Sequence, residues 1–450
     1  MVEVDPLEEW AQIFYEGWRH MRDFYWDPRL GGVDWGAVRD QYATLLPRLS
    51  TRTDLLDLMA EMIGELSTSH TYVFGGDFGT EVPRHPTGLL GADVSRKGKA
   101  FRDDRIYRGA PADGERSPLL DPGVGVSEGH YILAVNHRPF PDDLPFHAHF
   151  ERLSGAPVLL TVNDRPSEDG ARDVVVETLS GEGDIRYADW VRRNREYVAE
   201  KTGGKVGYVH VPDMMAAGLI EFNTWFYPQL DKAGMVVDMR WNGGGFVSQI
   251  ILERFRRPIV SFDRSRGGGV STYPYRTLNG PFVVLTNEHA GSDGDIFPAA
   301  VQLEGLAPVI GKHSWGGVVG INSLRPMVDG GILTQPQAAW WDPKRGWDLE
   351  NHGVDPDIVV ENLPQEFARG VDAQLDRGIE EVLRLQAERP PLEPRFGPAR
   401  PRGREAFRDE LAWHGGADEA PGTDSSAGPL SPRAATASAR AAASRRRPAE

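Results

Sequence analysis

A serine stands between glycines at the point where an apolar run gives way to an acidic segment. Residues 287–295 read NEHAGSDGD and follow the apolar run FVVL at 282–285, which predicts a buried strand that turns into a helix. The neighbouring glycines permit tight backbone geometry, and the first amides of the helix would point toward the space that the Ser292 hydroxyl enters. This pattern fits a nucleophile. A turn with a serine N-cap fits it as well, and Ala290 excludes the G-x-S-x-G motif.

A second loop that could take part in chemistry is RWNGGGF at residues 240–246, which also follows an apolar run. Three consecutive glycines, Gly243, Gly244 and Gly245, leave their backbone N–H groups open to close approach. Oxyanions and extended peptide backbones are bound by such groups. The alternative interpretation is a flexible turn.

A nucleophilic serine needs a base and a group that orients the base. His70, within STSHT, lies between a predicted helix and a predicted strand, and Glu350 lies in the polar stretch WDLENHGVDPDI. Taken singly, they fit a loop histidine bonded to backbone and a solvated acid, and their spacing does not bring them together. We expect no metal and no cofactor, because the histidines are scattered without an H-E-x-x-H motif and DGDIF lacks the rest of a calcium loop.

The elements that would position these residues divide the chain into regions. Helical periodicity at 7–21 and 55–66, the latter preceded by Asp54, predicts a mostly helical region over 1–80. Short strands with a brief helix near 145–153 fill 87–177, and 178–200 reads as a connector. Apolar runs at 205–211, 234–240, 281–287 and 307–311 alternate with candidate helices at 218–232, 246–256 and 293–304. This alternation predicts an α/β core with a mostly parallel, buried sheet over 178–388. Residues 389–450 read as a low-complexity, disordered tail.

Composition limits the classes of function. The chain has 450 residues, no cysteine and a formal net charge of −16, so disulfides and cysteine nucleophiles are excluded, and nucleic acid or an anionic membrane is not the expected partner. The acidic N-terminus does not read as a signal peptide, and no apolar stretch approaches the roughly 20 residues of a membrane span. The expected location is cytoplasmic.

Taken in order, STSH, a strand-rich module, RWNGGGF, NEHAGSDGDIFP and ENHGVDPDI resemble the tricorn protease family, which belongs to the S41 group of serine peptidases. The connecting sequence YADWVRRNREYVAEKTGGKVGYVHVPDM is also similar to that family, so that the resemblance covers about residues 5–385. It implies a helical N-terminal subdomain, a PDZ-like domain and a ClpP/crotonase-like α/β core. The tricorn β-propellers are not expected here, since the predicted helices begin the chain.

The resemblance also implies a Ser-His-Ser-Glu tetrad. Ser292 would be the nucleophile, His70 the base, and Glu350 would polarise the base through Ser69. Main-chain N–H groups of Gly245 and Asp293 would form the oxyanion hole. Hydrolysis of oligopeptides through an acyl-enzyme follows from these roles.

Two further features come from the resemblance. Asp263, in SFDRSRGG, aligns with an acidic residue that favours basic side chains at substrate position P1, although a solvated ion pair is equally consistent. The module at 87–177 resembles a PDZ domain, which binds extended peptides by strand addition or holds the catalytic pieces together. Assembly into a homo-oligomer is left open.

Two rival functions differ from this reading. The carboxy-terminal processing peptidases use a Ser-Lys dyad whose lysine lies in a turn that here reads SWGGVVG, with Gly317 at the lysine position and Lys312 before the turn. The other rival is a catalytically silent adaptor that binds peptides through the PDZ-like module.

Overall fold

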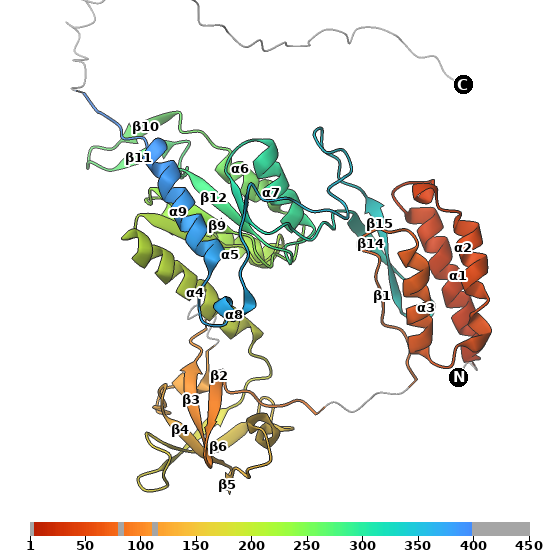
Figure 1. The fold of residues 1–450 in the computed structure, drawn as a ribbon, viewed down its shortest axis with the longest axis horizontal. Helices are drawn as coiled ribbons and strands as arrows, with labels where there is room; N and C mark the ends of the chain where they lie inside the picture. Colours follow the sequence, from red (N-terminus) through yellow and green to blue (C-terminus); the bar gives the residue numbers. More distant parts are fainter. Residues whose placement is uncertain (1–3, 80–84, 110–115, 398–450) are drawn as a thin grey trace, which may run out of the picture. The chain divides into compact units, whose positions relative to one another are not determined.

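The computed structural model describes residues 4–79, 85–109 and 116–397 (Figure 1). Residues 1–393 form one compact unit with a helical N-terminal region, a strand-rich module and a parallel sheet that carries helices on both faces. The predicted α/β class is confirmed. Most of the predicted tail, residues 398–450, lies outside the described residues.

The N-terminal region consists of three helices, α1 (Pro6–Phe24), α2 (Trp35–Ala43) and α3 (Arg52–Gly64), with short 3-10 turns at Leu30–Gly32 and Leu46–Arg48. The start of α3 is a capping box. The Thr51 hydroxyl accepts from the N–H of Asp54, and the Asp54 carboxylate accepts from the N–H of Thr51. The helices predicted at 7–21 and 55–66 are confirmed, whereas α2, which lacks a strong apolar period, was not predicted.

A small antiparallel sheet joins this helical region to a distant part of the sequence. It contains β1 (Val73–Phe74), β15 (Ile332–Ala338) and β14 (Gly320–Pro326) in the order β1-β15-β14. Val73 pairs with Leu333, and the side chains of Met327 and Leu333 lie in the same hydrophobic cluster as the buried faces of α1 and α3. The loop that carries His70 is therefore held between α3 and a strand about 260 residues further along the chain.

The strand-rich module has the sheet order β2-β3-β4-β6-β7, with β5 paired to β4. Its strands are β2 (Ala92–Lys97), β3 (Ala100–Ile106), β4 (Tyr131–Val135), β5 (Arg138–Pro139), β6 (Pro157–Asn163) and β7 (Arg172–Glu177). Its short helices are 3-10 turns at Pro118–Leu120 and Phe146–Phe150, the second of which lies at the helix predicted near 145–153. A cluster of buried aliphatic and aromatic side chains fills this module separately from the other cores.

The central sheet is entirely parallel, in the order β16-β13-β12-β9-β8. Its strands are β8 (Val206–His210), β9 (Gly234–Asp238), β12 (Phe282–Thr286), β13 (Val309–Gly311) and β16 (Ile358–Val359), and an antiparallel hairpin of β10 (Ser261–Arg264) and β11 (Val270–Tyr273) lies outside it. The four predicted apolar runs coincide with β8, β9, β12 and β13. Their residues are buried throughout, as expected for strands covered on both faces.

Alternate side chains of the sheet contact different helices. On one face, Val237 and Val284 pack with α5 (Ala216–Phe226), α6 (Ser248–Phe255) and α7 (Asp293–Leu303). On the other, Val236 and Leu285 pack with α4 (Gly183–Thr202) and α9 (Ala373–Glu388), the helix drawn in blue in Figure 1. A short 3-10 turn at Tyr227–Gln229 and helix α8 (Pro364–Phe367) complete the elements.

The segment predicted as a connector, 178–200, is largely helix α4. Charged side chains tie this helix to the strand-rich module: Arg186 pairs with Asp93 at 2.8 Å, and Asp189 pairs with Arg105. The many charges on α4 masked its helical period, because the buried residues are spaced widely among arginines and acids.

Candidate active site

Ser292 lies in a strained turn between β12 and α7. Its backbone angles are φ 59° and ψ −121°, a region that side chains other than glycine seldom occupy and that costs about 1–3 kcal/mol. The first turn of α7 supports it, since the Ser292 carbonyl accepts from the N–H groups of Asp295 at 2.8 Å and Ile296 at 3.1 Å. A strained, half-buried serine ahead of a helix is an arrangement that also occurs in nucleophile elbows.

The glycine loop lies directly against this serine. A Cβ on Gly244, where φ is +77°, would be 2.5 Å from Cβ of Ser292, so only glycine allows the approach. The loop is fixed by a bridge to Met214, whose N–H donates to the Gly244 carbonyl at 2.7 Å. Within the described chain, the N–H groups of Gly245 and Asp293 donate no hydrogen bond, and both residues line the cavity beside Ser292.

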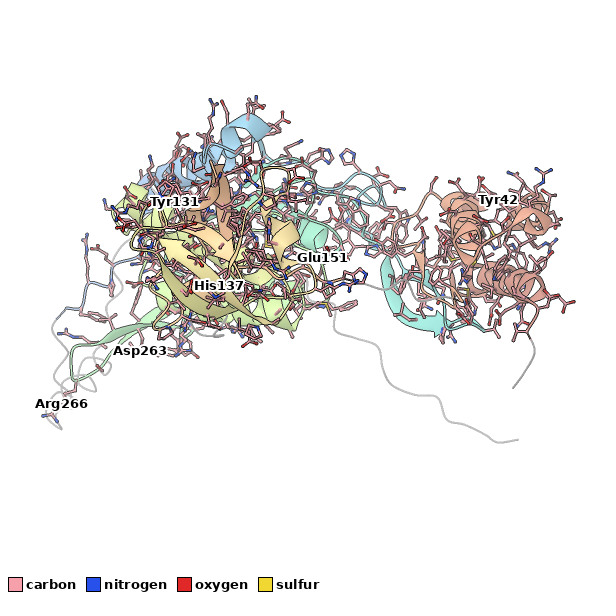
Figure 2. All side chains as sticks on the ribbon, turned by 90° about the horizontal axis from the view of Figure 1, so that it is seen from below. Tyr42, Tyr131, His137, Glu151, Asp263 and Arg266 are labelled. Atoms are coloured by element: carbon pink, nitrogen blue, oxygen red, sulfur yellow. The ribbon has the colours of Figure 1, made fainter. Side chains whose placement is uncertain are left out.

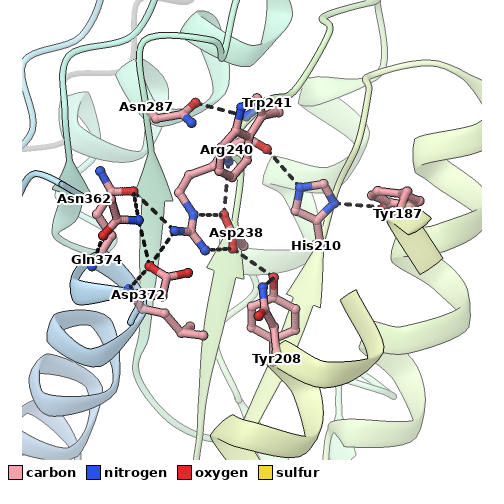
Figure 3. Close-up of polar contacts among 12 residues, drawn as sticks. Tyr187, Tyr208, His210, Asp238, Arg240, Trp241, Asn287, Asn362, Asp372 and Gln374 are labelled. Carbon is pink, nitrogen blue, oxygen red and sulfur yellow. Dashed lines mark hydrogen bonds and ion pairs between the residues drawn. The ribbon is translucent and has the colours of Figure 1, made fainter. Parts of the chain in front are cut away.

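A buried ion cluster holds the start of the glycine loop (Figure 3). The Arg240 guanidinium, fully buried, pairs with Asp238 at 2.6 Å and with Asp372 at 2.8 Å. The Arg240 carbonyl accepts from His210 Nε2 at 2.9 Å, and the Trp241 N–H donates to Asn287 Oδ1 at 3.0 Å. Loss of one partner would leave a buried charge unpaired, which is strongly destabilising. Sequence reasoning missed this cluster, although Asp238 and Arg240 stand at the end of a predicted buried strand, where a charge requires a partner.

His70 is joined to Glu350 through the hydroxyl of Ser69. Ser69 Oγ donates to Glu350 Oε2 at 3.2 Å and is 2.9 Å from His70 Nδ1. Because the single hydroxyl proton is donated to the carboxylate, Oγ accepts from Nδ1–H, and Nε2 of the neutral ring is left with its lone pair. Burial lowers the pKa of His70 below its usual 6.5, and the charge of Glu350 opposes that shift.

The Glu350 carboxylate is held by backbone amides as well. Oε1 accepts from the Ser69 N–H at 2.7 Å, and Oε2 accepts from the N–H groups of Val318 and Val319 at 2.7 and 3.1 Å. The carbonyl of His70 in turn accepts from the hydroxyl of Thr334 at 2.5 Å. The histidine loop is therefore anchored directly to two residues distant in sequence, Glu350 and Thr334, and through Glu350 to residues 318–319.

His70 and Ser292 line one cavity of about 550 Å³. The remaining lining comes from the glycine loop, from Asp293, and from mostly apolar side chains such as Met215, Phe246, Ile296, Ile321 and Trp340. Among the described residues, no hydrogen bond joins His70 Nε2 to Ser292 Oγ, although both side chains line this cavity.

The residues singled out by sequence thus divide into two groups. His70, Ser292, Asp293 and residues 243–245 line the cavity, with Ser69 and Glu350 bonded behind the imidazole. Asp263 is not among the lining residues. It is exposed on the β10–β11 hairpin, where Figure 2 shows it beside the loop that carries Arg266.

The geometry opposes a serine-lysine dyad. Lys312 Nζ pairs with Glu288 at 3.0 Å and with Glu361 at 3.5 Å and lines a different cavity, of about 230 Å³. A Cβ at Gly317, the position expected for the lysine, would collide with the ring of Trp315. A side chain there requires the Trp315 ring to move.

Two general properties of the described residues concern metal binding and membrane insertion. No group of three or more histidine or acidic side chains there has an arrangement that would hold a metal ion. None of the helices described has both the length and the apolar character needed to cross a bilayer.

Comparison with known proteins places these features in a family. Residues 6–64 match the family model of the tricorn protease C1 domain, residues 88–181 that of the tricorn protease PDZ domain, and residues 205–360 that of peptidase family S41. The chain is similar to a crystal structure of the tricorn protease, with a TM-score of 0.80 and 35% identity over 85% of this chain and 37% of that one.

Two curated sequences illustrate the similarity. Tricorn protease homolog 1 of Streptomyces coelicolor is 44% identical over 87% of this chain and 37% of its own length. The putative tricorn-like protease C-terminal subunit of Sulfurisphaera tokodaii is 40% identical over 86% of this chain and 45% of its own. The chain spans less than half the length of these relatives.

Proposed function

Because the chain belongs to peptidase family S41 and, within it, to the tricorn group, we propose that it is a serine peptidase that hydrolyses oligopeptides, with Ser292 as its nucleophile. One observation carries the proposal. A strained serine lines a single cavity with a histidine and two backbone N–H groups; neither the histidine Nε2 nor these N–H groups has a hydrogen-bond partner among the described residues.

Formation of the acyl-enzyme begins with proton transfer. When a peptide fills the cavity, His70 Nε2 removes the proton from Ser292 Oγ, and Oγ attacks the carbonyl carbon of the scissile bond. The imidazolium that forms is stabilised through Ser69 by the negative charge of Glu350. His70 then protonates the leaving amine, the C–N bond breaks, and the first product leaves. Water, deprotonated by His70, hydrolyses the ester and restores the serine.

The developing oxyanion needs two preorganised donors. The N–H groups of Gly245 and Asp293 suit this role because they have no partner within the described chain and both residues line the cavity that Ser292 lines. The Asp293 side chain does not compete, since its carboxylate accepts from the N–H and hydroxyl of Ser248 at 2.9 and 2.5 Å.

The direct test is labelling with a fluorophosphonate probe, which reacts with activated serines. Wild type should be labelled, and Ser292→Ala and His70→Ala should each abolish labelling while keeping the thermal transition of wild type. Ser261→Ala, at an exposed serine on β10, serves as the matched control and should label fully. Absence of labelling in folded wild type, with peptide binding that requires residues 87–177, would favour the adaptor instead.

Several finer features remain proposals on the same basis. We retain 1–80 as the base-bearing subdomain, 87–177 as a PDZ-like domain and 178–388 as the nucleophile-bearing core. Limited proteolysis should cut between these ranges first.

A substrate preference for basic P1 residues through Asp263 requires its hairpin to reach a bound peptide. Asp263→Asn should then reduce cleavage after Lys and Arg relative to Leu, and an unchanged ratio would remove this residue from the site.

Cellular location and assembly are proposals too. We propose a cytoplasmic enzyme that acts on peptides, and cell fractionation would test the location. The relative from Sulfurisphaera tokodaii carries the word subunit in its name, which supports assembly into a homo-oligomer or with another chain. Light scattering of the purified protein would separate these from a monomer.

A further inference from the structure

A four-residue segment links the nucleophile helix to the carboxylate behind the histidine. In this segment, residues 316–319 (the GGVV segment), every backbone N–H donates to a carboxylate. Those of Gly316 and Gly317 donate to Asp295 at 2.8 and 3.2 Å, and the next two donate to Glu350 at 2.7 and 3.1 Å. The two carboxylates thus hold opposite ends of one short strip.

Asp295 belongs to the first turn of α7, three residues after Ser292. Its side chain is fully buried, and its own N–H donates to the Ser292 carbonyl at 2.8 Å. Burial raises its pKa to about 6, while hydrogen bonds from Ser314, Gly316 and Gly317 act in the opposite direction. A buried carboxylate without a cation depends on such donors, so the position of Asp295 and that of the GGVV segment fix each other.

Trp315 carries this constraint to the histidine. The Trp315 N–H donates to the Ala290 carbonyl at 2.8 Å, and a Cβ on Gly291 would approach the ring to 2.7 Å. The same ring meets the His70 imidazole edge-on, with ring centroids 5.6 Å apart. Trp315 therefore contacts both the loop that bears the nucleophile and the base.

We propose that Asp295 is a positioning residue that sets the distance between Ser292 and His70, by holding the GGVV segment and Trp315. This rests on the proposed peptidase function. Asp295 is absent from the described cavity lining, so it acts without touching substrate. Its loss should lower the rate of acylation and leave substrate binding nearly unchanged, because a displacement of about 1 Å between reacting groups can cost about a hundredfold in rate.

The test compares Asp295→Asn with Asp189→Asn. The asparagine at 295 offers one acceptor oxygen and presents an NH2 group to a backbone donor. Asp189 is also buried and is bonded to Arg105 and Arg192. It lies on α4, which packs on the other face of the central sheet from α7, so its substitution reports general destabilisation. Peptide hydrolysis, fluorophosphonate labelling and thermal unfolding are measured for both.

For Asp295→Asn we expect kcat and the labelling rate to fall at least about tenfold, with KM within about threefold of wild type. Asp189→Asn should lower the unfolding temperature and leave kcat unchanged. A second variant, Trp315→Ala, changes a half-exposed residue and should reproduce the fall in kcat if Asp295→Asn does not fold.

Two results would overturn the inference. The first is a folded Asp295→Asn variant that keeps the wild-type kcat. The second applies if Asp295→Asn does not fold, and it is a Trp315→Ala variant that keeps the wild-type kcat. An inactive, unlabelled wild type would instead refute the proposed function, and the inference with it, so the two failures are distinguishable.

Discussion

The substitution Glu350→Gln tests the link between the carboxylate and the base with almost no change in shape. The Glu350 carboxylate accepts four hydrogen bonds, one at Oε1 and three at Oε2. A glutamine has one oxygen and one NH2 group at these places. The more favourable amide orientation places the oxygen at the Oε2 position, where it accepts from three donors. The NH2 group then faces the Ser69 N–H, and these two donors cannot form a hydrogen bond with each other.

The free energy follows from this count. The variant loses one charge-assisted hydrogen bond, worth about 1.5–3 kcal/mol, and weakens three others because the acceptor is neutral. We therefore expect the free energy of unfolding to fall by about 2–4 kcal/mol. Glu350 is only partly buried, so solvent relieves part of the loss and the lower end applies. The negative charge that stabilises the imidazolium disappears as well, and kcat should fall by about 10²–10⁴-fold.

The assay combines urea unfolding with hydrolysis of a fluorogenic peptide. Glu288→Gln is the matched control, since this glutamate pairs with Lys312 at the surface and does not line the site cavity. It should change neither quantity appreciably. If Glu350→Gln retained kcat within about threefold of wild type while losing stability as predicted, the carboxylate would be a structural anchor and not the partner of the base.

Three further outcomes are expected. The acid limb of the kcat/KM profile should lie below pH 6.5, because burial lowers the pKa of His70 and the base must be neutral. The stability that this group contributes is present above pH 6.5 and is lost as the pH falls through the lower pKa of the folded state. An acid limb above pH 6.5 would contradict the assignment of His70 as the base. Gly244→Ala should abolish labelling, because its Cβ would lie 2.5 Å from Cβ of Ser292. The control Gly98→Ala, at φ +63° with open space around it, should lower the free energy of unfolding by about 1–2 kcal/mol and label fully. Lys312→Ala should hydrolyse peptides at the wild-type rate and change stability by less than about 1 kcal/mol, as for exposed ion pairs; loss of activity would revive the serine-lysine dyad.

The sequence predicted the elements whose signal is local. Continuous apolar runs identified the strands of the parallel sheet, and Asp54 marked the first turn of α3, since the capping box involves residues three positions apart. Helix α4 was not recognised because its polar residues find partners in the strand-rich module, which no periodicity reports. Strands β14 and β15 were missed for a similar reason, because they pair with β1 and pack on helices at the other end of the chain.

The site was predictable to the extent that it resembles a known family. The elbow at Ser292 and the glycine loop carry a signal of their own. Ser69 and Glu350 do not, because they are 281 positions apart and only the folded chain brings them within hydrogen-bonding distance. The contributions of Asp295 and Trp315 depend on backbone donors in a loop, and amino-acid identity gives no sign of those.

The pairing of β1 with β15 governs when this protein acquires its site during synthesis. The core of the N-terminal helices includes Met327 and Leu333, so a nascent chain that ends before them leaves that core open. Contacts of such long sequence separation form late, because a large loop must close first. The histidine loop also lacks its carboxylate until residue 350 has been added. A growing chain therefore contains the whole sequence of the strand-rich module well before it contains the residues that hold the His70 loop in place.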